Sequence, residues 1–133
     1  MNLYQAKEVT KMLLEFKCSN HRSIKEKVSF SMIAGSDNTS EELLKKFGNF
    51  RILRSAVIYG ANGSGKSNFI SALSFMKDLV SNSINHQPGQ GVFQARHKLS
   101  AEETPSEYSI QFVRNDIRYA YGFSVKQNLI QDE

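Results

Sequence analysis

Cysteine is almost absent from this sequence, which excludes a disulfide-stabilised fold and a metal site built from several thiolates. Cys18 is the single cysteine among the 133 residues, and both kinds of site need more than one. Because Cys18 lies in an apolar stretch, we predict that it is a small buried side chain.

Long hydrophobic runs are also missing. No stretch approaches the roughly 20 apolar residues that a membrane-spanning helix needs, and the first residues, MNLYQAKE, contain no apolar core of a secretory signal. No internal repeat or low-complexity tract is visible. We therefore expect a cytoplasmic protein with no membrane partner.

The composition that is present is that of one folded domain. Hydrophobic residues make up 40% of the chain, with nine Phe and five Tyr, and this content favours a packed core over disorder. The net charge is +4, and the excess lies in residues 1–55, which hold ten Lys and Arg against six Asp and Glu. An excess of four positive charges spread over 55 residues usually belongs to a solvated face of the protein, and contact with DNA is the weaker alternative.

Residues 60–67 read GANGSGKS and fit the phosphate-binding pattern GxxxxGK[ST]. Glycines allow successive backbone N–H groups to point inward at an anion, and a following helix adds the positive end of its dipole. Lys66 can reach the β- and γ-phosphates, and the Ser67 hydroxyl can bind the Mg²⁺ that bridges them. The predicted nucleotide-binding residues are Gly60, Ala61, Asn62, Gly63, Ser64, Gly65, Lys66, Ser67 and Asn68, with Ser67 as the Mg²⁺ ligand.

Both flanks of this motif fit a strand–loop–helix unit. Residues 52–59 form the predicted strand, in which the apolar run 56–59 is typical of a buried parallel strand. Apolar residues recur at helical spacing through residues 66–82, which predicts a helix there. This agreement makes a glycine-rich surface turn that matches by chance the lesser alternative.

The first half of the chain predicts antiparallel strands. Residues 1–11 are a polar lead, and the domain is expected to occupy residues 12–133. Alternation predicts strands over 13–18 and 27–34, joined by a turn at 19–23. On the first strand the residues expected on one face are Leu14, Phe16 and Cys18; on the second they are Val28, Phe30 and Met32.

The remaining segments predict loops and one clear hairpin. A polar loop over 35–49 contains a short predicted helix over 41–47, capped by Ser40. Residues 83–104 are a predicted loop with room for one short strand over 91–99. Two alternating strands then flank a turn at Asn115-Asp116. Their apolar residues are Tyr108, Ile110 and Phe112 on one strand and Ile117, Tyr119, Tyr121, Phe123 and Val125 on the other.

These motifs resemble the nucleotide-binding heads of ABC-type ATPases, in particular the SMC, RecF and OLD-like class. The resemblance covers residues 12–133 and is closest to stand-alone prokaryotic AAA-family ATPases found in phage-defence systems. It implies an α/β fold with α+β character: the N-terminal lobe of a P-loop NTPase head, with antiparallel strands flanking one strand–P-loop–helix unit. The residues that carry it are LEF at 14–16, NHRS at 20–23, VIYGANG at 57–63, NGSGKSN at 62–68 and YAYGF at 119–123.

The resemblance also assigns a role to the first turn. In this class a basic residue of that turn reaches toward the nucleotide phosphates. The matching residue is Arg22, and His21 stands where the class usually has an aromatic residue. Arg22 is therefore an implied phosphate contact, and a solvent-facing turn arginine is the alternative.

Heads of this class need further motifs that are not recognisable here: a glutamine loop, a serine-glycine signature, an apolar strand ending in Asp-Glu, and a switch histidine. LIQDE at 129–133 imitates the Asp-Glu strand, but Gln131 interrupts the apolar run that a buried strand would have. We predict an ordinary strand end there. The chain is accordingly expected to be the N-terminal part of a longer, apparently truncated ATPase.

Other candidate sites have simpler interpretations. His21, His86 and His97 lack metal-ligand spacing and are predicted to lie on the surface. Ser64 and Ser67 have no His and Asp at a spacing that suggests a nucleophile. The aromatic residues of the hairpin are predicted to pack in the core and not to stack on bases.

The predicted function is binding of ATP and Mg²⁺ by one lobe of an ATPase, with hydrolysis requiring further motifs and a dimer or oligomer partner. No catalytic residue is predicted. The resemblance adds a nuclease or another effector domain or subunit as a partner. The alternative from a different class is a non-catalytic nucleotide-sensing or dimerisation module. A small P-loop kinase or GTPase fits less well, because such proteins lack two antiparallel strands before the loop and no NKxD motif occurs here.

Overall fold

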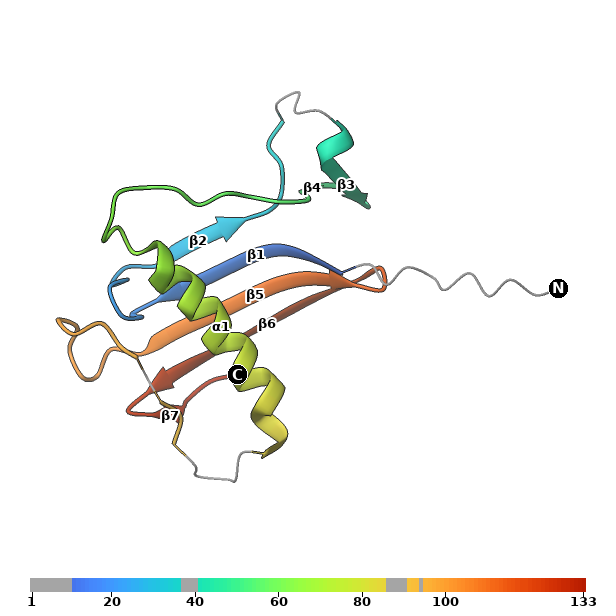
Figure 1. The fold of residues 1–133 in the computed structure, drawn as a ribbon. Helices are drawn as coiled ribbons and strands as arrows, with labels where there is room; N and C mark the ends of the chain where they lie inside the picture. The colour runs from blue at the N-terminus through green and yellow to red at the C-terminus, as the bar shows by residue number, and fades with distance from the viewer. Residues whose placement is uncertain (1–10, 37–40, 86–90, 94) are drawn as a thin grey trace.

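One long helix lies across one face of an antiparallel five-stranded sheet (Figure 1). The computed structural model describes residues 11–36, 41–85, 91–93 and 95–133. The sheet has the strand order β2-β1-β5-β6-β7, and a separate two-stranded sheet pairs β3 with β4. In chain order the elements are β1 (Lys11–Ser19), β2 (Val28–Ser31), the 3₁₀ turn η1 (Glu41–Leu43), β3 (Leu44–Phe47), β4 (Phe50–Leu53), α1 (Lys66–Asn82), the 3₁₀ turn η2 (Ser83–Asn85), β5 (Ser106–Arg114), β6 (Ile117–Lys126) and β7 (Leu129–Ile130).

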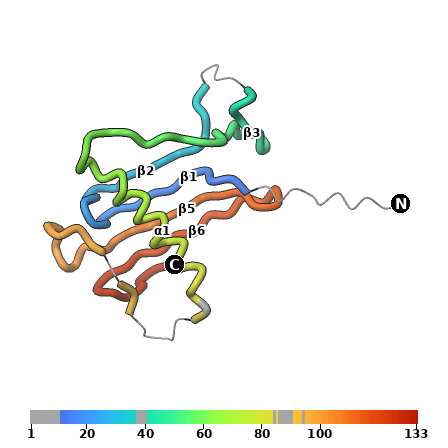
Figure 2. The backbone as a smooth tube through the Cα atoms, viewed as in Figure 1, coloured from blue at the N-terminus to red at the C-terminus, as the bar shows by residue number. Residues whose placement is uncertain are grey.

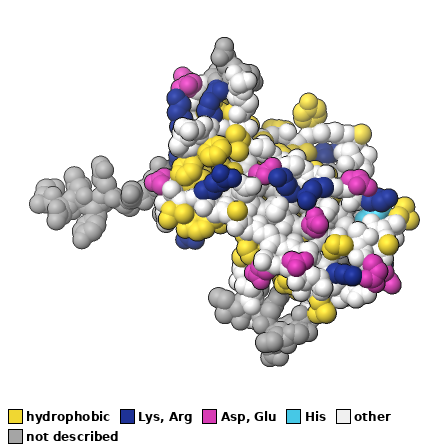
Figure 3. Space-filling model, turned by 180° about the vertical axis from the view of Figure 1, so that it is seen from behind, with side chains coloured by type: hydrophobic (Ala, Val, Ile, Leu, Met, Phe, Trp, Pro, Cys, Tyr) yellow, Lys and Arg dark blue, Asp and Glu magenta, His cyan; other side chains and the backbone are white. Residues whose placement is uncertain are grey.

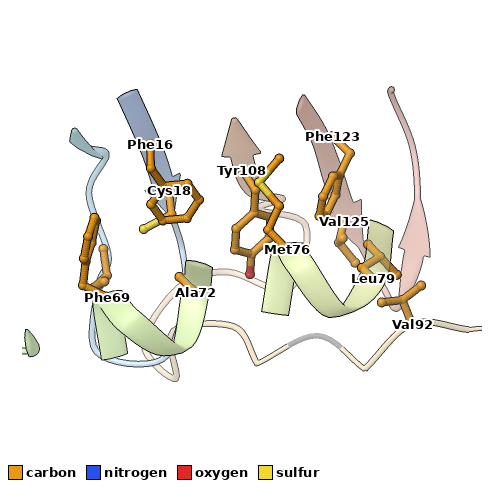
Figure 4. Packing of buried hydrophobic residues seen from close by; sticks show 11 residues of the cluster. Phe16, Cys18, Phe69, Ala72, Met76, Leu79, Val92, Tyr108, Phe123 and Val125 are labelled. Carbon is orange, nitrogen blue, oxygen red and sulfur yellow. The ribbon is translucent and has the colours of Figure 1, made fainter. Parts of the chain in front are cut away.

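The helix α1 has the predicted bounds, Lys66 to Asn82. Its buried residues follow one another at intervals of three or four, so they form one stripe along the helix that faces the sheet. Figure 4 shows these side chains packed against residues that point from β1, β5 and β6. The cluster includes Phe69, Ala72, Met76 and Leu79 from α1 and Phe16, Cys18, Tyr108, Phe123 and Val125 from the sheet.

The predicted hairpin is confirmed as β5 and β6, paired from Ser106–Val125 to Arg114–Ile117. Asn115 and Asp116 form the turn with φ of 53° and 61°. A two-residue turn with both φ values positive matches the right-handed twist of the strands, and Asn and Asp tolerate this conformation better than most residues. The prediction that Cys18 is buried is also confirmed: its side chain is fully enclosed, and burial raises the pKa of its thiol to about 11.

A β-bulge in β1 separates residues that simple alternation places together. Leu13 pairs with Phe112 and Glu15 with Gln111, so Leu14 has no partner on β5. The extra residue reverses the alternation, because two residues of β1 then face one of its neighbour. Phe16 and Cys18 pack under α1, whereas Leu14 packs with Ile52 and Val113 in a second cluster. The prediction that Leu14 shares a face with Phe16 and Cys18 is therefore wrong.

The three residues predicted to share one face of the strand over 27–34 lie in different surroundings. Phe30 packs against the cluster under α1, Met32 packs against the Leu14 cluster, and Val28 is exposed. Strand β2 ends at Ser31, after which Ile33 forms an isolated bridge with Ile52 of β4. Met32 N still donates to Leu14 O of β1 (2.8 Å), and Met32 O accepts from Leu53 N of β4 (2.8 Å), so Met32 lies between the two sheets and packs with Leu14.

The predicted helix over 41–47 is wrong beyond its first turn. Residues 41–43 form η1, and β3 and β4 then pair from Leu44–Leu53 to Phe47–Phe50 around a turn in which Gly48 has φ of 54°. Leu44 and Ile52 are buried, so tertiary packing of the hairpin outweighs the weak helical preference of the segment. Ser40, the predicted cap, lies outside the described residues.

The predicted parallel strand over 56–59 does not form. Residues 54–65 run from β4 past the edge strand β2 to the start of α1 without a strand assignment (Figure 2). Val57 and Tyr59 are 84% and 90% exposed. No described strand pairs with this segment, and an apolar run becomes a buried strand only where neighbouring strands cover it. Likewise, no strand is assigned within the described part of 91–99, although Val92 N donates to Asn128 O (2.6 Å).

The sheet face away from α1 is largely polar. Figure 3 shows Lys and Arg interspersed with Asp and Glu on that side, with hydrophobic side chains gathered toward the β3–β4 hairpin. Ion pairs join Lys17 to Glu15 (2.8 Å) and Lys27 to Glu107 (3.1 Å). In the part of the chain that the structure describes, no helix has the length and hydrophobicity to cross a bilayer.

Candidate phosphate-binding site

The glycine-rich loop ends in a backbone conformation that glycine adopts without strain. Gly63 and Gly65 have φ of 81° and 93°, and a β-carbon disfavours both conformations. Ser64 N donates to Ala61 O (3.2 Å), which closes a tight turn inside the loop. Gly65 caps α1, and its carbonyl accepts the first helical hydrogen bond, from Phe69 N (2.9 Å). The first turn of the helix therefore leads directly out of the loop.

Lys66 is folded over this loop. Its Nζ donates to Gly60 O (2.8 Å) and Ala61 O (2.7 Å) and lies 3.4 Å from the hydroxyl oxygen of Ser64. Carbonyl oxygens hold the ammonium group over the loop without neutralising it, since they carry no net charge. The positive charge thus lies at the mouth of the loop, beside the N-terminal end of α1, where the helix dipole also favours an anion.

Two open hollows adjoin Lys66. One, of about 260 Å³, is lined by Ser64 and Lys66 together with residues of β2 and of the 58–59 segment. The other, of about 460 Å³, is lined by Lys66, Ser67, Ile70 and the 56–58 segment. No Asp or Glu is among the described residues that line either hollow. The electrostatic character of the site is therefore positive, as an anion such as a polyphosphate requires.

The turn between β1 and β2 lies against the loop. Asn68 Nδ2 donates to Ser23 Oγ (2.6 Å), and a β-carbon built on Gly65 would be 3.4 Å from the same oxygen. Arg22 has φ of 51°, its side chain is exposed, and its N–H donates to Ala95 O (2.7 Å). The structure thus brings the turn to the helix start through Ser23. Arg22 lines a neighbouring hollow with Asn68 and not the two hollows lined by Lys66.

His21 is not on the surface, which corrects the sequence prediction. Its side chain is 1% exposed, Nδ1 lies 2.8 Å from the hydroxyl of Tyr108, and Nε2 lies 3.3 Å from Ser71 Oγ. Burial, with a smaller contribution from the charge of Arg22, lowers the pKa of His21 to about 4. Burial also raises the pKa of Tyr108. At neutral pH His21 is uncharged and connects the turn to α1, one helical turn beyond Ser67.

Asn20 is a second buried polar residue that sequence reasoning missed. Its side chain is 1% exposed and bonds to three backbone groups: Nδ2 donates to Thr104 O (2.8 Å) and Pro105 O (3.3 Å), and Oδ1 accepts from His97 N (3.0 Å). A signal was available, because Asn20 continues the alternation of Phe16 and Cys18. An interior amide at that position indicates a side chain that organises backbone around it.

The other histidines and the terminal carboxylates lie elsewhere. His97 is half-buried, and His86 is outside the described residues. Asp132 Oδ2 accepts from Ser124 Oγ (3.3 Å), and Glu133 accepts from the Tyr121 hydroxyl (2.6 Å). The Leu129–Ile130 segment is the short antiparallel strand β7, as predicted for an ordinary strand end. Among the described residues no group of three His, Cys, Asp or Glu is placed to hold a metal ion.

Loop, lysine and helix match the loop-to-helix part of a P-loop nucleotide-binding unit, whereas the strand that enters such a loop does not form. A family model described as "AAA domain, putative AbiEii toxin, Type IV TA system" matches residues 55–133, more than half of the chain. The chain belongs to this family of AAA domains, which makes it a nucleotide-binding, ATPase-type module. No curated protein and no solved structure matched the chain. The matched region contains the glycine-rich loop, α1 and the β5–β6 hairpin.

Proposed function

We propose that this chain is the ATP·Mg²⁺-binding lobe of an ABC-type, SMC- and OLD-like ATPase, with the nucleotide phosphates bound by residues 60–67. The observation that supports it best is the position of the Lys66 ammonium, 2.7–2.8 Å from the carbonyls of Gly60 and Ala61 over a loop with two left-handed glycines. In this arrangement the backbone amides cradle the phosphates, and Lys66 neutralises the β- and γ-phosphates.

The hydroxyl of Ser67 is the proposed Mg²⁺ ligand. Ser67 is exposed and lines the same hollow as Lys66. Mg²⁺ prefers oxygen ligands in octahedral geometry and usually keeps several waters, so one hydroxyl together with phosphate oxygens suits it. When bound, the ion would neutralise charge on the β- and γ-phosphates. The role of Ser67 is to fix the position of the ion relative to the loop.

Hydrolysis, in this proposal, requires groups beyond those that surround the loop. In-line attack on the γ-phosphate needs a positioned water and further charge stabilisation, and the described lining of both Lys66 hollows contains no carboxylate. We propose that a second subunit supplies part of this machinery. The exposed apolar side chains of Val57, Tyr59 and Ile70, which lie next to the loop, support an interface there.

The second candidate function is a non-catalytic nucleotide-sensing or dimerisation module, which the same carboxylate-free lining favours. An effector partner such as a nuclease and a role in phage defence belong to the proposal through the sequence resemblance. The family description names a putative toxin of a type IV toxin–antitoxin system. DNA contact is the weakest part, since cationic side chains are mixed with acidic ones on the face in Figure 3.

Lys66→Ala tests the proposal directly. The change removes the cation at the mouth of the loop, and we expect ATP affinity to fall by about tenfold or more, because hydrogen bonds to charged groups are worth about 1.5–3 kcal/mol each. Binding of a fluorescent ATP analogue with Mg²⁺ measures it. Lys77→Ala is the matched control, because it removes the same charge from an exposed position of the same helix. Equal ATP affinity in wild type and Lys66→Ala would refute the assignment.

A phosphate-release assay on the same proteins tests whether this chain hydrolyses ATP by itself. We expect the chain alone to stay at background and Lys66→Ala to leave that background unchanged. Turnover that depends on Lys66 would show that this chain carries its own hydrolytic groups, and Asp132 and Glu133 would then be the first residues to substitute.

A further inference from the structure

An apolar groove of about 440 Å³ lies beside the second half of α1, over the ends of β5 and β6 next to their turn. Figure 1 shows α1 crossing the sheet obliquely, so that β1, β5 and β6 extend past the helix near this turn. Helix and hairpin both line the groove, with Leu73, Lys77 and Val80 from α1 and Ile110, Phe112 and Tyr119 from the hairpin. Val80 and Tyr119 are 43% and 42% exposed. A contiguous apolar surface that stays open to solvent is typical of an interaction site.

The wall of the groove is a second stripe of α1. The residues of α1 that are buried against the sheet occupy positions 69, 72, 76 and 79. One position further along the chain, the same 3-4-3 spacing recurs in Ile70, Leu73, Lys77 and Val80. This spacing is that of the seam along which a second helix packs beside the first. Ile70 and Val80 are 51% and 43% exposed, so the described residues leave much of this seam uncovered.

The floor of the groove has the width of one helix. Three strands, β1, β5 and β6, form it, and at a spacing of about 4.8 Å they extend about 10 Å across. A helix with its side chains has a diameter of about 10–12 Å. Phe112 and Tyr119 stack in this floor with ring centroids 5.2 Å apart, and Leu13 of β1 pairs with Phe112. A helix seated there would contact aromatic rings beneath it and the second stripe of α1 at its side.

The charges around the groove select an acidic occupant. Lys77 is in the lining, and the described lining contains no carboxylate. Arg114 lies two residues beyond Phe112 on β5, hence on the same face, and Lys11 pairs with it across β1. None of these three cations forms an ion pair with a carboxylate that the structure describes. A second copy of this chain is a poor occupant, because a symmetric contact through the groove would bring the same cations face to face.

We propose that this groove is a docking site for an amphipathic α-helix of another polypeptide. The apolar stripe of that helix packs between the second stripe of α1 and the floor of β5 and β6, and its acidic side chains lie beside Lys77 and the Lys11–Arg114 pair. This is the helix-in-groove mode of recognition. Lys77 lies eleven residues beyond Lys66, about 16 Å along the helix axis, so the groove is separate from the phosphate-binding loop.

Two labelled helical peptides of 17 residues, the length of α1, test the proposal. Both carry Leu at the a and d positions of their heptads; the acidic peptide has Glu at e and g, and the basic peptide has Lys there. Fluorescence anisotropy with the 133-residue chain measures binding. We expect the acidic peptide to bind one to one and at least about tenfold more tightly than the basic one, because several attractions become repulsions in the basic peptide.

Substitutions locate the binding surface. We expect Lys77→Glu and Val80→Ser each to weaken the acidic peptide by about fivefold or more, and Lys77→Glu to strengthen the basic one. Lys98→Glu and Leu99→Ser are the matched controls, since both residues are exposed and lie outside the groove. Lys98→Glu changes the net charge by the same amount as Lys77→Glu, so it reports any unspecific attraction. Urea denaturation of each variant verifies that it is folded.

Three outcomes would overturn the proposal. Neither peptide binds, or both bind equally; or the control variants lose as much affinity as Lys77→Glu and Val80→Ser; or sedimentation velocity shows a dimer of this chain that Val80→Ser dissociates, in which case a second copy occupies the groove. Lys66→Ala should bind the acidic peptide as wild type does. The result is thereby independent of the proposed ATP binding.

Discussion

Asn20→Ala provides a sharp test of how the candidate site is held together. The amide is buried and bonds to three backbone groups of residues 97–105. Removing these bonds leaves three partly buried backbone groups of that segment without their partner. With two short bonds and one at 3.3 Å, the loss amounts to about 2–3 kcal/mol of the free energy of unfolding. Asn20 also has φ of 51°, a conformation that costs Ala about 1 kcal/mol or more.

Asn115→Ala is a matched control, because Asn115 has nearly the same φ, 53°, but lies exposed in the β5–β6 turn. It should lose the conformational part alone, about 1 kcal/mol. Urea denaturation followed by circular dichroism gives both values, with the slope of the transition checked for constancy. A loss for Asn20→Ala no larger than that for Asn115→Ala would refute the reasoning. It would also remove the argument that Asn20 fixes the 95–105 segment to the turn.

Two further predictions follow from buried contacts. The pKa of His21 is lowered to about 4 in the folded chain. As the pH falls, the unfolded state therefore binds a proton at His21 before the folded state does. The stabilising contribution of neutral His21 is complete above pH about 6.5 and is lost as the pH falls toward 4. Urea melts between pH 4 and 7 should show His21→Phe with a flatter pH dependence than wild type, and parallel curves would contradict this. At Gly122 an added β-carbon would lie 3.0 Å from Tyr108 O and 3.2 Å from the Ser109 β-carbon. Gly122→Ala should cost about 1–3 kcal/mol in the same assay, with Gly91→Ala, whose nearest contact would be 3.5 Å, as the control that should change little.

Local patterns determined the elements whose partners are close in sequence. The apolar stripe of α1 and the Asn115-Asp116 turn specify their elements without reference to distant residues. The helix was predicted with its correct bounds, and the hairpin with its correct turn. Gly63 and Gly65 likewise have positive φ, a conformation that glycine adopts without strain because it has no β-carbon. For these features the physical cause, helical periodicity or tolerance of positive φ, lies within a few residues.

The tertiary structure decided the features that depend on a distant partner. Alternation could not reveal the bulge that moves Leu14 to a second cluster, because the bulge exists only in the pairing of β1 with β5. The apolar run 56–59 indicated a buried strand, but burial requires neighbouring strands, and none of the described strands pairs with it. His21 lies in a polar turn by sequence, yet Tyr108 and Ser71 enclose it from β5 and α1. The proximity of the β1–β2 turn, the 95–105 segment and the start of α1 has the same origin: contacts across 40 to 90 residues of chain, which no local pattern encodes.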